Sequence, residues 1–199
     1  MFAMVIFTVS CNSDSLFFPS FDSDDLTLAE RRLLRTGEPP LTDLRVFPSA
    51  TVIKELDVVK AKMDEAWDMM LEHCTSAGRY EYGFCIYLNS NGTIYLGEMQ
   101  HGPFTPNDGS TSTINLVVDR NPDDLCAVFH AHTSYKYMPY YYERTTGPSD
   151  CDINAADSFH IPGLVYDYTQ SIVEGGENLT DHRVYTYGYY NPRPSYFPH

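Results

Sequence analysis

Two histidines separated by one residue follow directly on a short apolar run, and this arrangement constrains the fold more than any other feature of the chain. The apolar run is Leu125–Phe129, and it continues into His130-Ala131-His132. Residues i and i+2 share one face of a β-strand but not of an α-helix. A short apolar run of this kind is typical of a buried strand. We therefore expect a strand end from which both imidazoles project on the same side.

A second polar group, Ser149–Asp152, begins seventeen residues after His132 (149 − 132). Ser and Asp are preferred at the N-cap and in the first turn, so a helix is predicted from Ser149 to about Ser158. Imidazole and carboxylate are the usual ligands of a catalytic zinc, which makes His130, His132 and Asp152 a candidate metal site. The alternative is an ordinary pair of surface histidines beside an ordinary helix cap.

A metal-dependent hydrolase also needs a proton acceptor, which is usually a carboxylate that does not bind the metal. Glu81 stands near the start of Arg79–Tyr87, a strand-like run rich in aromatic and β-branched residues. The run leads through the hairpin signal Asn89–Gly92 into a second strand, Thr93–Glu98. Considered alone, Glu81 has the pattern of an exposed carboxylate at a strand end. It becomes a candidate base only together with the histidines.

The order Glu81, then His130-Ala131-His132, then Ser149–Asp152 resembles the motif of the JAB/MPN (JAMM) metalloprotease family. The chain is most similar to a poorly characterised bacterial branch of that family, often found in secreted or toxin-associated proteins. The resemblance implies that His130, His132 and Asp152 bind zinc. It further implies that Glu81 is the general base and that Ser149 helps to stabilise the oxyanion of the tetrahedral intermediate.

Two features depart from the family pattern. The spacing from His132 to Ser149 is longer than usual because of a Tyr-rich insert, Tyr135–Glu143, and Gly83 follows Glu81 by two residues instead of three. Both ends of the insert are tied to proposed site residues, so we expect it to flank the metal cleft as a lid or binding loop. The alternative is that its tyrosines pack back onto the domain.

Hydrophobic spacing predicts the remaining elements. Apolar residues at helical spacing predict a long helix over Thr51–Cys74, ended by Gly78. Further elements are expected as a short helix at Leu26–Arg35, an edge strand at Leu44–Phe47, and strands at Thr113–Val118 and Ile161–Tyr168. The predicted fold class is α/β, with a mixed sheet, a long helix on the N-terminal side and a short helix after the histidine strand. The resemblance implies a JAB/MPN-like, cytidine-deaminase-like architecture.

The first residues are apolar for nine positions and then run through Ser10 and Cys11 into polar sequence. This stretch is too short to span a membrane as a helix. It is similar to the end of a bacterial lipoprotein signal, cleaved before a lipid-modified Cys11. Residues 1–25 are thus predicted to be signal and spacer, and 26–199 a single domain with N- and C-terminal extensions. A lipid anchor at Cys11 implies the cell envelope; the alternative, a buried N-terminal strand, leaves a cytoplasmic location.

Composition limits the partners. A net charge of −14 and an isoelectric point near 4.7 argue against binding nucleic acid or an anionic membrane through charge. The five cysteines form no CxxC pair and indicate no disulfide framework.

Three functions follow from these observations. The first is a zinc-dependent hydrolase of amide or isopeptide bonds, acting on a protein, peptide or peptidoglycan-type substrate. The second is a catalytically silent JAB-like module that binds a protein partner through the Tyr-rich loop. The third is a surface lipoprotein without metal. All five motif positions are present, and a silent module has no physical need for Glu81 or the histidine pair, so the first is favoured.

Overall fold

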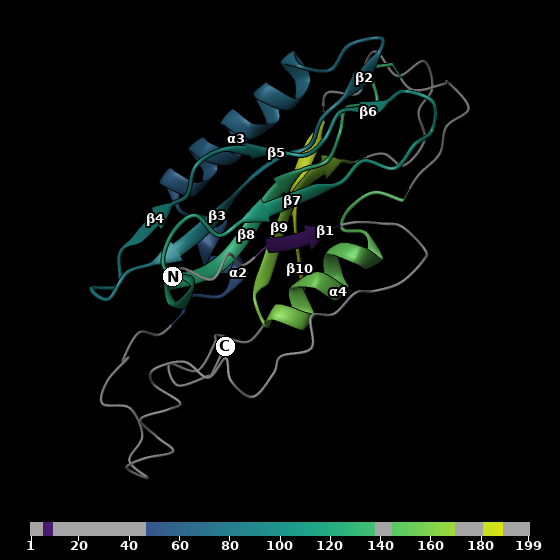
Figure 1. The fold of residues 1–199 in the computed structure, drawn as a ribbon. Helices are drawn as coiled ribbons and strands as arrows, with labels where there is room; N and C mark the ends of the chain where they lie inside the picture. Colours follow the sequence, from purple (N-terminus) through teal and green to yellow (C-terminus); the bar gives the residue numbers. More distant parts are fainter. Residues whose placement is uncertain (1–5, 10–46, 138–144, 170–180, 189–199) are drawn as a thin grey trace.

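A mixed β-sheet forms the centre of the molecule, and helices cover both of its faces (Figure 1). The computed structural model describes residues 6–9, 47–137, 145–169 and 181–188. The central mixed sheet with its covering helices confirms the α/β class and the mixed sheet that the sequence predicted. Among these residues, no helix has both the length and the apolar character needed to cross a membrane.

The sheet has the strand order β10-β9-β8-β3-β4, and β5 also pairs with β3. Its strands are β3 (Tyr82–Leu88), β4 (Ile94–Leu96), β5 (Gln100–His101), β8 (Leu125–Ala131), β9 (Pro162–Tyr168) and β10 (His182–Gly188). The β8–β9 pair is parallel and the other pairs are antiparallel. A parallel pair requires a crossover, which contains helix α4 (Asp150–Phe159). The histidine strand β8 therefore lies inside the sheet, between β3 and β9.

The single long helix predicted over Thr51–Cys74 is wrong, because the structure has two helices there. They are α2 (Ala50–Ile53) and α3 (Asp57–Glu72). Leu56 has an extended backbone, with φ −73° and ψ 127°, and forms the N-cap of α3. Asp57 then starts the new helix, where a negative charge is favourable. Leu56 keeps the helical spacing of the apolar residues across the break, so the hydrophobic pattern does not reveal it.

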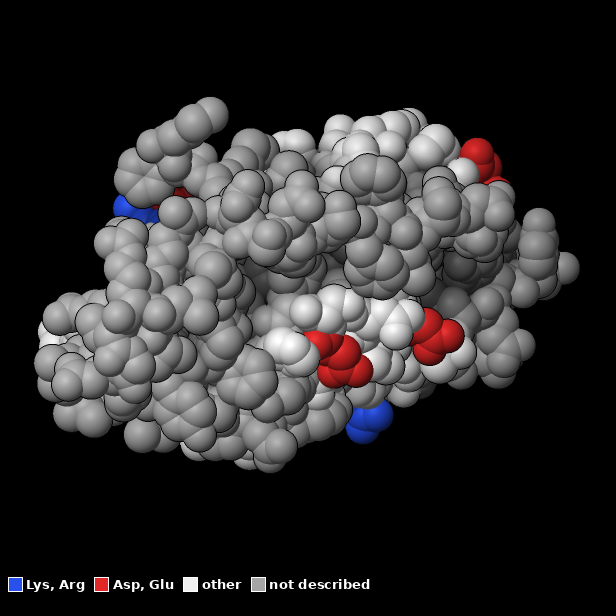
Figure 2. All heavy atoms as spheres, turned by 60° about the horizontal axis from the view of Figure 1, so that its bottom comes forward, with Lys and Arg blue, Asp and Glu red and all other residues white. Residues whose placement is uncertain are grey.

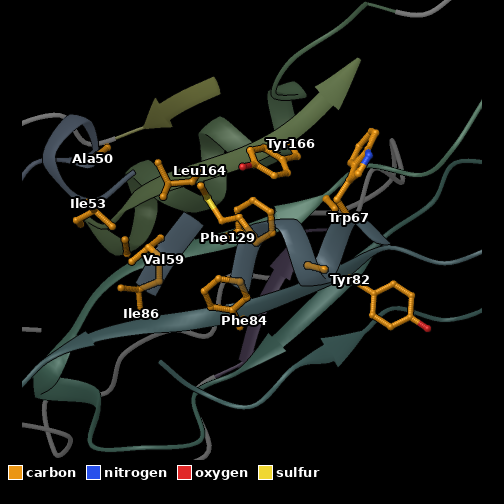
Figure 3. Close-up of a cluster of buried hydrophobic side chains, with 14 of the residues drawn as sticks. Ala50, Ile53, Val59, Trp67, Tyr82, Phe84, Ile86, Phe129, Leu164 and Tyr166 are labelled. Carbon is orange, nitrogen blue, oxygen red and sulfur yellow. The ribbon is translucent and has the colours of Figure 1, made fainter. Parts of the chain in front are cut away.

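The largest hydrophobic core lies between α3 and the sheet (Figure 3). Alternate residues of each central strand point towards α3, as the period of a β-strand requires. The buried side chains of this core include Val59, Met63, Trp67 and Met70 from α3, Phe84 and Ile86 from β3, Phe129 from β8, and Leu164 and Tyr166 from β9. The Met and Trp stripe of the helix is therefore core.

The opposite face of the sheet is covered by α4, which contacts β9 and β10, and by β7 (Ile114–Val117). Two smaller clusters lie here, one around Tyr87 and Val128 and one formed by Ala156, Val165 and Tyr187. With both faces covered, β8 and β9 are buried along their whole length.

Short elements complete the described structure. They are β1 (Ile6–Val9), which pairs antiparallel with β7; β2 (Gly78–Arg79), which pairs with β6 (Thr105–Pro106); and a 3₁₀ turn at Pro122–Asp124. Residues 6–9 thus form a strand, and cleavage before Cys11 would remove it. Cys11, the helix expected at Leu26–Arg35, the boundary at residues 25/26 and residues 44–46 of the expected edge strand lie outside the described residues. Phe47 is described and lies outside any strand.

Charged side chains are scattered over the visible described surface. On the face drawn in Figure 2, the described Lys and Arg side chains do not gather into a patch.

Candidate metal centre

The two histidines lie at the end of β8. His130 is the last residue but one of the strand, and His132 follows Ala131, the last. The backbone N–H of His132 still donates to the carbonyl of Tyr166, at 3.0 Å, and so continues the pairing with β9. The two imidazole rings lie side by side, with centroids 4.9 Å apart. The prediction that both project to the same side is confirmed, although the side chains are buried and not on the surface.

The start of α4 fixes the position of Asp152. Ser149 is the N-cap, as predicted, and its Oγ accepts a hydrogen bond from the N–H of Asp152 at 3.2 Å. In return, Asp152 Oδ2 accepts from the N–H of Ser149 at 2.6 Å and from its hydroxyl at 2.8 Å. These reciprocal bonds form a capping box. The carboxylate of Asp152 is held in one orientation by this cap and is 1% exposed.

The three side chains converge on one point. Nε2 of His130 lies 3.3 Å from Oδ1 of Asp152, and Nε2 of His132 lies 3.4 Å from Oδ2. One nitrogen or oxygen from each residue lies within 4.8 Å of the others. Oδ1 of Asp152 is buried and accepts no hydrogen bond from the residues that the structure describes. Buried polar atoms normally have a partner, so a cation placed between these atoms would satisfy an otherwise costly oxygen.

The charge of Asp152 suits this role. Burial by itself would raise the pKa of the carboxyl group. The neighbouring His130 and His132, together with the N–H of Ser149, outweigh burial and lower the pKa below its usual value. Asp152 is therefore an anion at neutral pH. Two imidazole nitrogens and one carboxylate oxygen form the donor set of a metal site that keeps a further position open, and the group could hold a metal ion.

The sequence predicted one strand over Arg79–Tyr87, which includes Glu81. In the structure, Glu81 lies in the short connection between β2 and β3 and belongs to neither strand. It is 5% exposed, so the pattern of an exposed strand-end carboxylate does not describe it. Strand β3 pairs Gly83 with His130 and Tyr82 with Ala131, which places Glu81 next in register, at the level of His132. A Cβ atom on Gly83 would collide with the carbonyl oxygen of Phe129, so glycine permits the close approach of β3 to β8 here.

A cavity of about 370 Å³ brings Glu81 together with two of the candidate ligands. Glu81, His132 and Asp152 all line it. Most of the other lining side chains carry hydroxyl groups: Ser110, Thr111, Ser112, Thr133, Thr145 and Ser149. The arrangement places a buried carboxylate and a candidate metal site beside a polar cavity that has room for part of a substrate.

Arg79 fixes one wall of this cavity. It is 2% exposed, and its guanidinium donates to the carbonyls of Pro106 and Ser110, at 2.8 and 2.7 Å. Its Nε also donates to Oγ1 of Thr133 at 3.0 Å. One buried side chain therefore ties the loop of Ser110 to the segment that follows His132. Sequence reasoning treated Arg79 only as the start of a strand.

Two further residues contact the histidines from behind, and sequence reasoning did not select either. Nδ1 of His132 lies 2.9 Å from Oδ2 of Asp167, and Nδ1 of His130 lies 3.3 Å from the hydroxyl of Tyr187. A signal for Asp167 was present, because it is the single charged residue in the apolar strand predicted at Ile161–Tyr168. Tyr187 had no distinguishing signal among the sixteen tyrosines.

The Tyr-rich insert divides into two described tyrosines and a part that is outside the described residues. Tyr135 is 1% exposed and stacks on Tyr168, with ring centroids 4.5 Å apart. For Tyr135, packing onto the domain is therefore correct. Tyr137 is 38% exposed. Residues 138–144 lie outside the described part of the chain, so the expectation that the insert flanks the cleft stays a prediction for them.

Within the described part of the chain, no two of the four cysteines Cys74, Cys85, Cys126 and Cys151 form a disulfide with each other. The first three are buried, as expected for small core residues. Burial raises the pKa of Cys85 to about 12, so this thiol is unreactive at neutral pH.

Comparisons of the chain with protein-family models, with curated proteins and with solved structures found no match.

Proposed function

We propose that this chain is a zinc-dependent hydrolase of amide or isopeptide bonds with a JAB/MPN-like site. The observation that carries the proposal is the convergence of two imidazole nitrogens and one carboxylate, all buried, within 4.8 Å of one another. Burial of three ionisable groups is costly unless they bind something that compensates for their desolvation. Two imidazoles and one carboxylate are ligand types that catalytic zinc sites use.

Each residue has a distinct role in this proposal. His130 and His132 would hold zinc through Nε2, and Asp152 through Oδ1. When bound, zinc would act as a Lewis acid towards a substrate carbonyl and lower the pKa of water to about 7. Glu81, which lines the same cavity as His132 and Asp152, would accept the proton of the attacking water. It would then pass this proton to the nitrogen of the leaving amine.

Ser149 would stabilise the oxyanion only after a change of hydrogen bond. Its hydroxyl donates to Oδ2 of Asp152 at 2.8 Å, and its Oγ accepts a hydrogen bond from the N–H of Asp152. The hydroxyl would have to turn from Oδ2 towards the substrate. The backbone N–H of Ser149 would continue to hold Asp152 through this change.

The cavity is compatible with an amide of a polar chain. Its lining carries hydroxyl groups, which can bond to the carbonyl and N–H groups of a protein, peptide or peptidoglycan-type substrate. The acidic charge of the chain disfavours nucleic acid as an alternative substrate.

Metal analysis tests the proposal directly. The purified protein, loaded with zinc and dialysed, should retain about one zinc per chain, as a three-ligand site requires. The double variant His130→Ala/His132→Ala should retain none. The double variant His73→Ala/His101→Ala is the matched control, because it also removes two imidazoles whose Nδ1 atoms bond to backbone carbonyls. Full zinc occupancy in the first double variant would reject the site.

Hydrolysis tests the role of Glu81. Glu81→Gln should retain zinc and lose cleavage of a fluorogenic panel of peptide, lysine-isopeptide and peptidoglycan-type amides. Glu98→Gln is the control, because it neutralises an exposed carboxylate that is paired with Arg120 at 3.5 Å. Zinc binding without cleavage of any substrate in the wild type would favour the silent binding module.

Lipid attachment at Cys11 is a separate proposal, and it implies a location in the cell envelope. Strand β1 (Ile6–Val9) and a processed Cys11 exclude each other in one molecule, because the cleavage removes the strand. Intact mass of the protein from a bacterial membrane fraction decides between them. A diacylglycerol adduct on a chain that starts at Cys11 supports the anchor, and an unmodified chain that retains Ile6–Val9 contradicts it.

A further inference from the structure

The hydrogen bonds behind the two histidines show which nitrogen of each ring faces the metal position. Both Nε2 atoms face Asp152, at 3.3 and 3.4 Å. Both Nδ1 atoms face away from it, towards Asp167 for His132 and towards Tyr187 for His130. A neutral imidazole carries one proton, so a nitrogen that donates behind the ring leaves the other nitrogen free to bind a metal.

Resting on the proposed zinc site, we propose that Asp167 and Tyr187 are its positioning residues. Asp167 would hold His132, and Tyr187 would hold His130, in the form with a proton on Nδ1. Both Nε2 lone pairs then point at the position next to Asp152 before any metal arrives. Partners of this kind fix the tautomer and the orientation of metal-binding histidines.

The surroundings of Asp167 hold its carboxylate in position as a hydrogen-bond acceptor for His132. It is 0% exposed, and its Oδ2 accepts from the N–H of Gly147 at 2.9 Å as well as facing Nδ1 of His132. Its Oδ1 accepts from the N–H of Tyr168 at 2.8 Å. Two fixed backbone donors thus orient both oxygens, which leaves donation to Asp167 as the role of His132 Nδ1. The bond to Gly147 also ties this carboxylate to the loop that leads to Ser149.

Tyr187 is equally constrained. It is 2% exposed, and its ring lies over Gly163 of β9, where a Cβ atom would collide with it. The absent side chain lets the hydroxyl reach across β9 to His130 on β8. A phenol hydroxyl is a weaker hydrogen-bond partner than a carboxylate, so the two histidines have partners of different strength.

The amide variant of Asp167 gives the sharpest test. In Asp167→Asn, one orientation of the amide points its NH₂ group at the N–H of Tyr168. The other points it at the N–H of Gly147 and at Nδ1 of His132, which would force the proton of His132 onto Nε2. In each orientation the NH₂ group, a donor, faces at least one backbone N–H donor. Zinc affinity should fall by about 10- to 100-fold.

Tyr187→Phe removes one oxygen atom and should weaken zinc binding less, by about 3- to 10-fold, because a neutral hydrogen bond is weaker than one to a carboxylate. Two matched controls should keep the wild-type affinity. Asp119→Asn changes a carboxylate that accepts from Tyr87 and from the N–H of Glu98. Tyr185→Phe removes a hydroxyl of β10 that donates to the carbonyl of Tyr168.

The experiment combines competitive zinc titration with ¹H–¹⁵N spectra of the imidazoles in the zinc-loaded proteins. We expect Nδ1–H signals for both histidines in the wild type, a change at His132 alone in Asp167→Asn, and a change at His130 alone in Tyr187→Phe. A purely structural role would alter both rings or neither. If Asp167→Asn does not fold, Tyr187→Phe decides through the His130 signal.

The outcomes separate the two proposals. A wild-type protein that binds no zinc overturns the proposed function, and the positioning role falls with it. A wild type that binds zinc, with Asp167→Asn and Tyr187→Phe both at wild-type affinity and with unchanged imidazole signals, overturns the positioning role alone.

Discussion

The two faces of strand β8 differ sharply although they alternate residue by residue. Phe129 and Ala131 point towards α3 and belong to the large apolar core. His130 and His132 meet Asp152 of α4 on the other side. Both faces are buried, so exposure to water does not explain why the second face, apolar at Val128, becomes polar at His130 and His132.

The difference between the two faces of β8 indicates that the apolar face stabilises the fold and that the polar side chains have another role. Apolar burial contributes about 25 cal/mol per Å², whereas buried ionisable groups cost free energy unless they are paired well. An apolar replacement of the polar group would be at least as stable in many proteins. The buried His-His-Asp group inside the sheet therefore supports the proposed metal site better than it supports a stabilising role.

The largest expected effect comes from the apolar face. Phe129→Ala should lower the free energy of unfolding by about 3–5 kcal/mol, because it leaves a cavity in the core. The ring centroids of Phe84 and Tyr166 lie 5.1 and 5.3 Å from that of Phe129. Urea unfolding with a chelator present measures the change. The folded fraction should still bind one zinc per chain.

The control for this variant is Phe104→Ala, because Phe104 is 49% exposed. Its unfolding free energy should stay within about 0.5 kcal/mol of the wild type. Equal losses in the two variants would remove the distinction between the α3 core and the surface.

A smaller effect is expected when the metal is removed. Zinc at 100 times its dissociation constant should add about 2.7 kcal/mol to the unfolding free energy of the wild type. The variant His130→Ala/His132→Ala should gain nothing from zinc. Thermal unfolding with and without chelator measures both. An equal gain in the two proteins would mean that zinc binds elsewhere.

Sequence reasoning located the motif residues because strand and helix periodicity act locally. The H-x-H pattern could be placed on one side of a strand end, and Ser149 could be placed at an N-cap, without knowing the rest of the fold. The break at Leu56 was missed for the opposite reason. Leu56 fits the helical spacing of the apolar residues, and only its backbone conformation shows that a new helix begins.

The residues behind the histidines depend on tertiary structure. Asp167 reaches His132 because β9 lies parallel to β8, and Tyr187 reaches His130 across Gly163. Neither the strand order nor the close approach at Gly163 can be predicted from the spacing of residues along the chain. A lone charge in an apolar strand, as at Asp167, is nevertheless a signal that a buried partner exists.

The helix cap provides a third, smaller test of the polar face. Ser149→Ala removes the Oγ that accepts the N–H of Asp152, and it should cost about 1 kcal/mol of stability. Asp152 keeps its bond from the N–H of Ser149, so zinc should still bind, with reduced affinity. Asp152→Asn is the counterpart, since it retains an oxygen for the cap but loses the charge, and it should lose zinc with little change in stability. Urea unfolding and zinc titration of both variants check this, and the reverse pattern would show that Asp152 is only a cap.

The smallest expected effect concerns the two described tyrosines of the insert. Tyr135 is buried against Tyr168, and Tyr137 is 38% exposed. Tyr137→Ala should therefore change the unfolding free energy by less than about 0.5 kcal/mol, whereas Tyr135→Ala should behave as a core variant. If the insert binds substrate, Tyr137→Ala should raise KM and leave zinc content unchanged, because an exposed tyrosine offers a flat apolar face and a hydroxyl to a polymer chain. An unchanged KM together with a large loss of stability would assign Tyr137 to the apolar core, and recognition by this part of the insert would have to be abandoned.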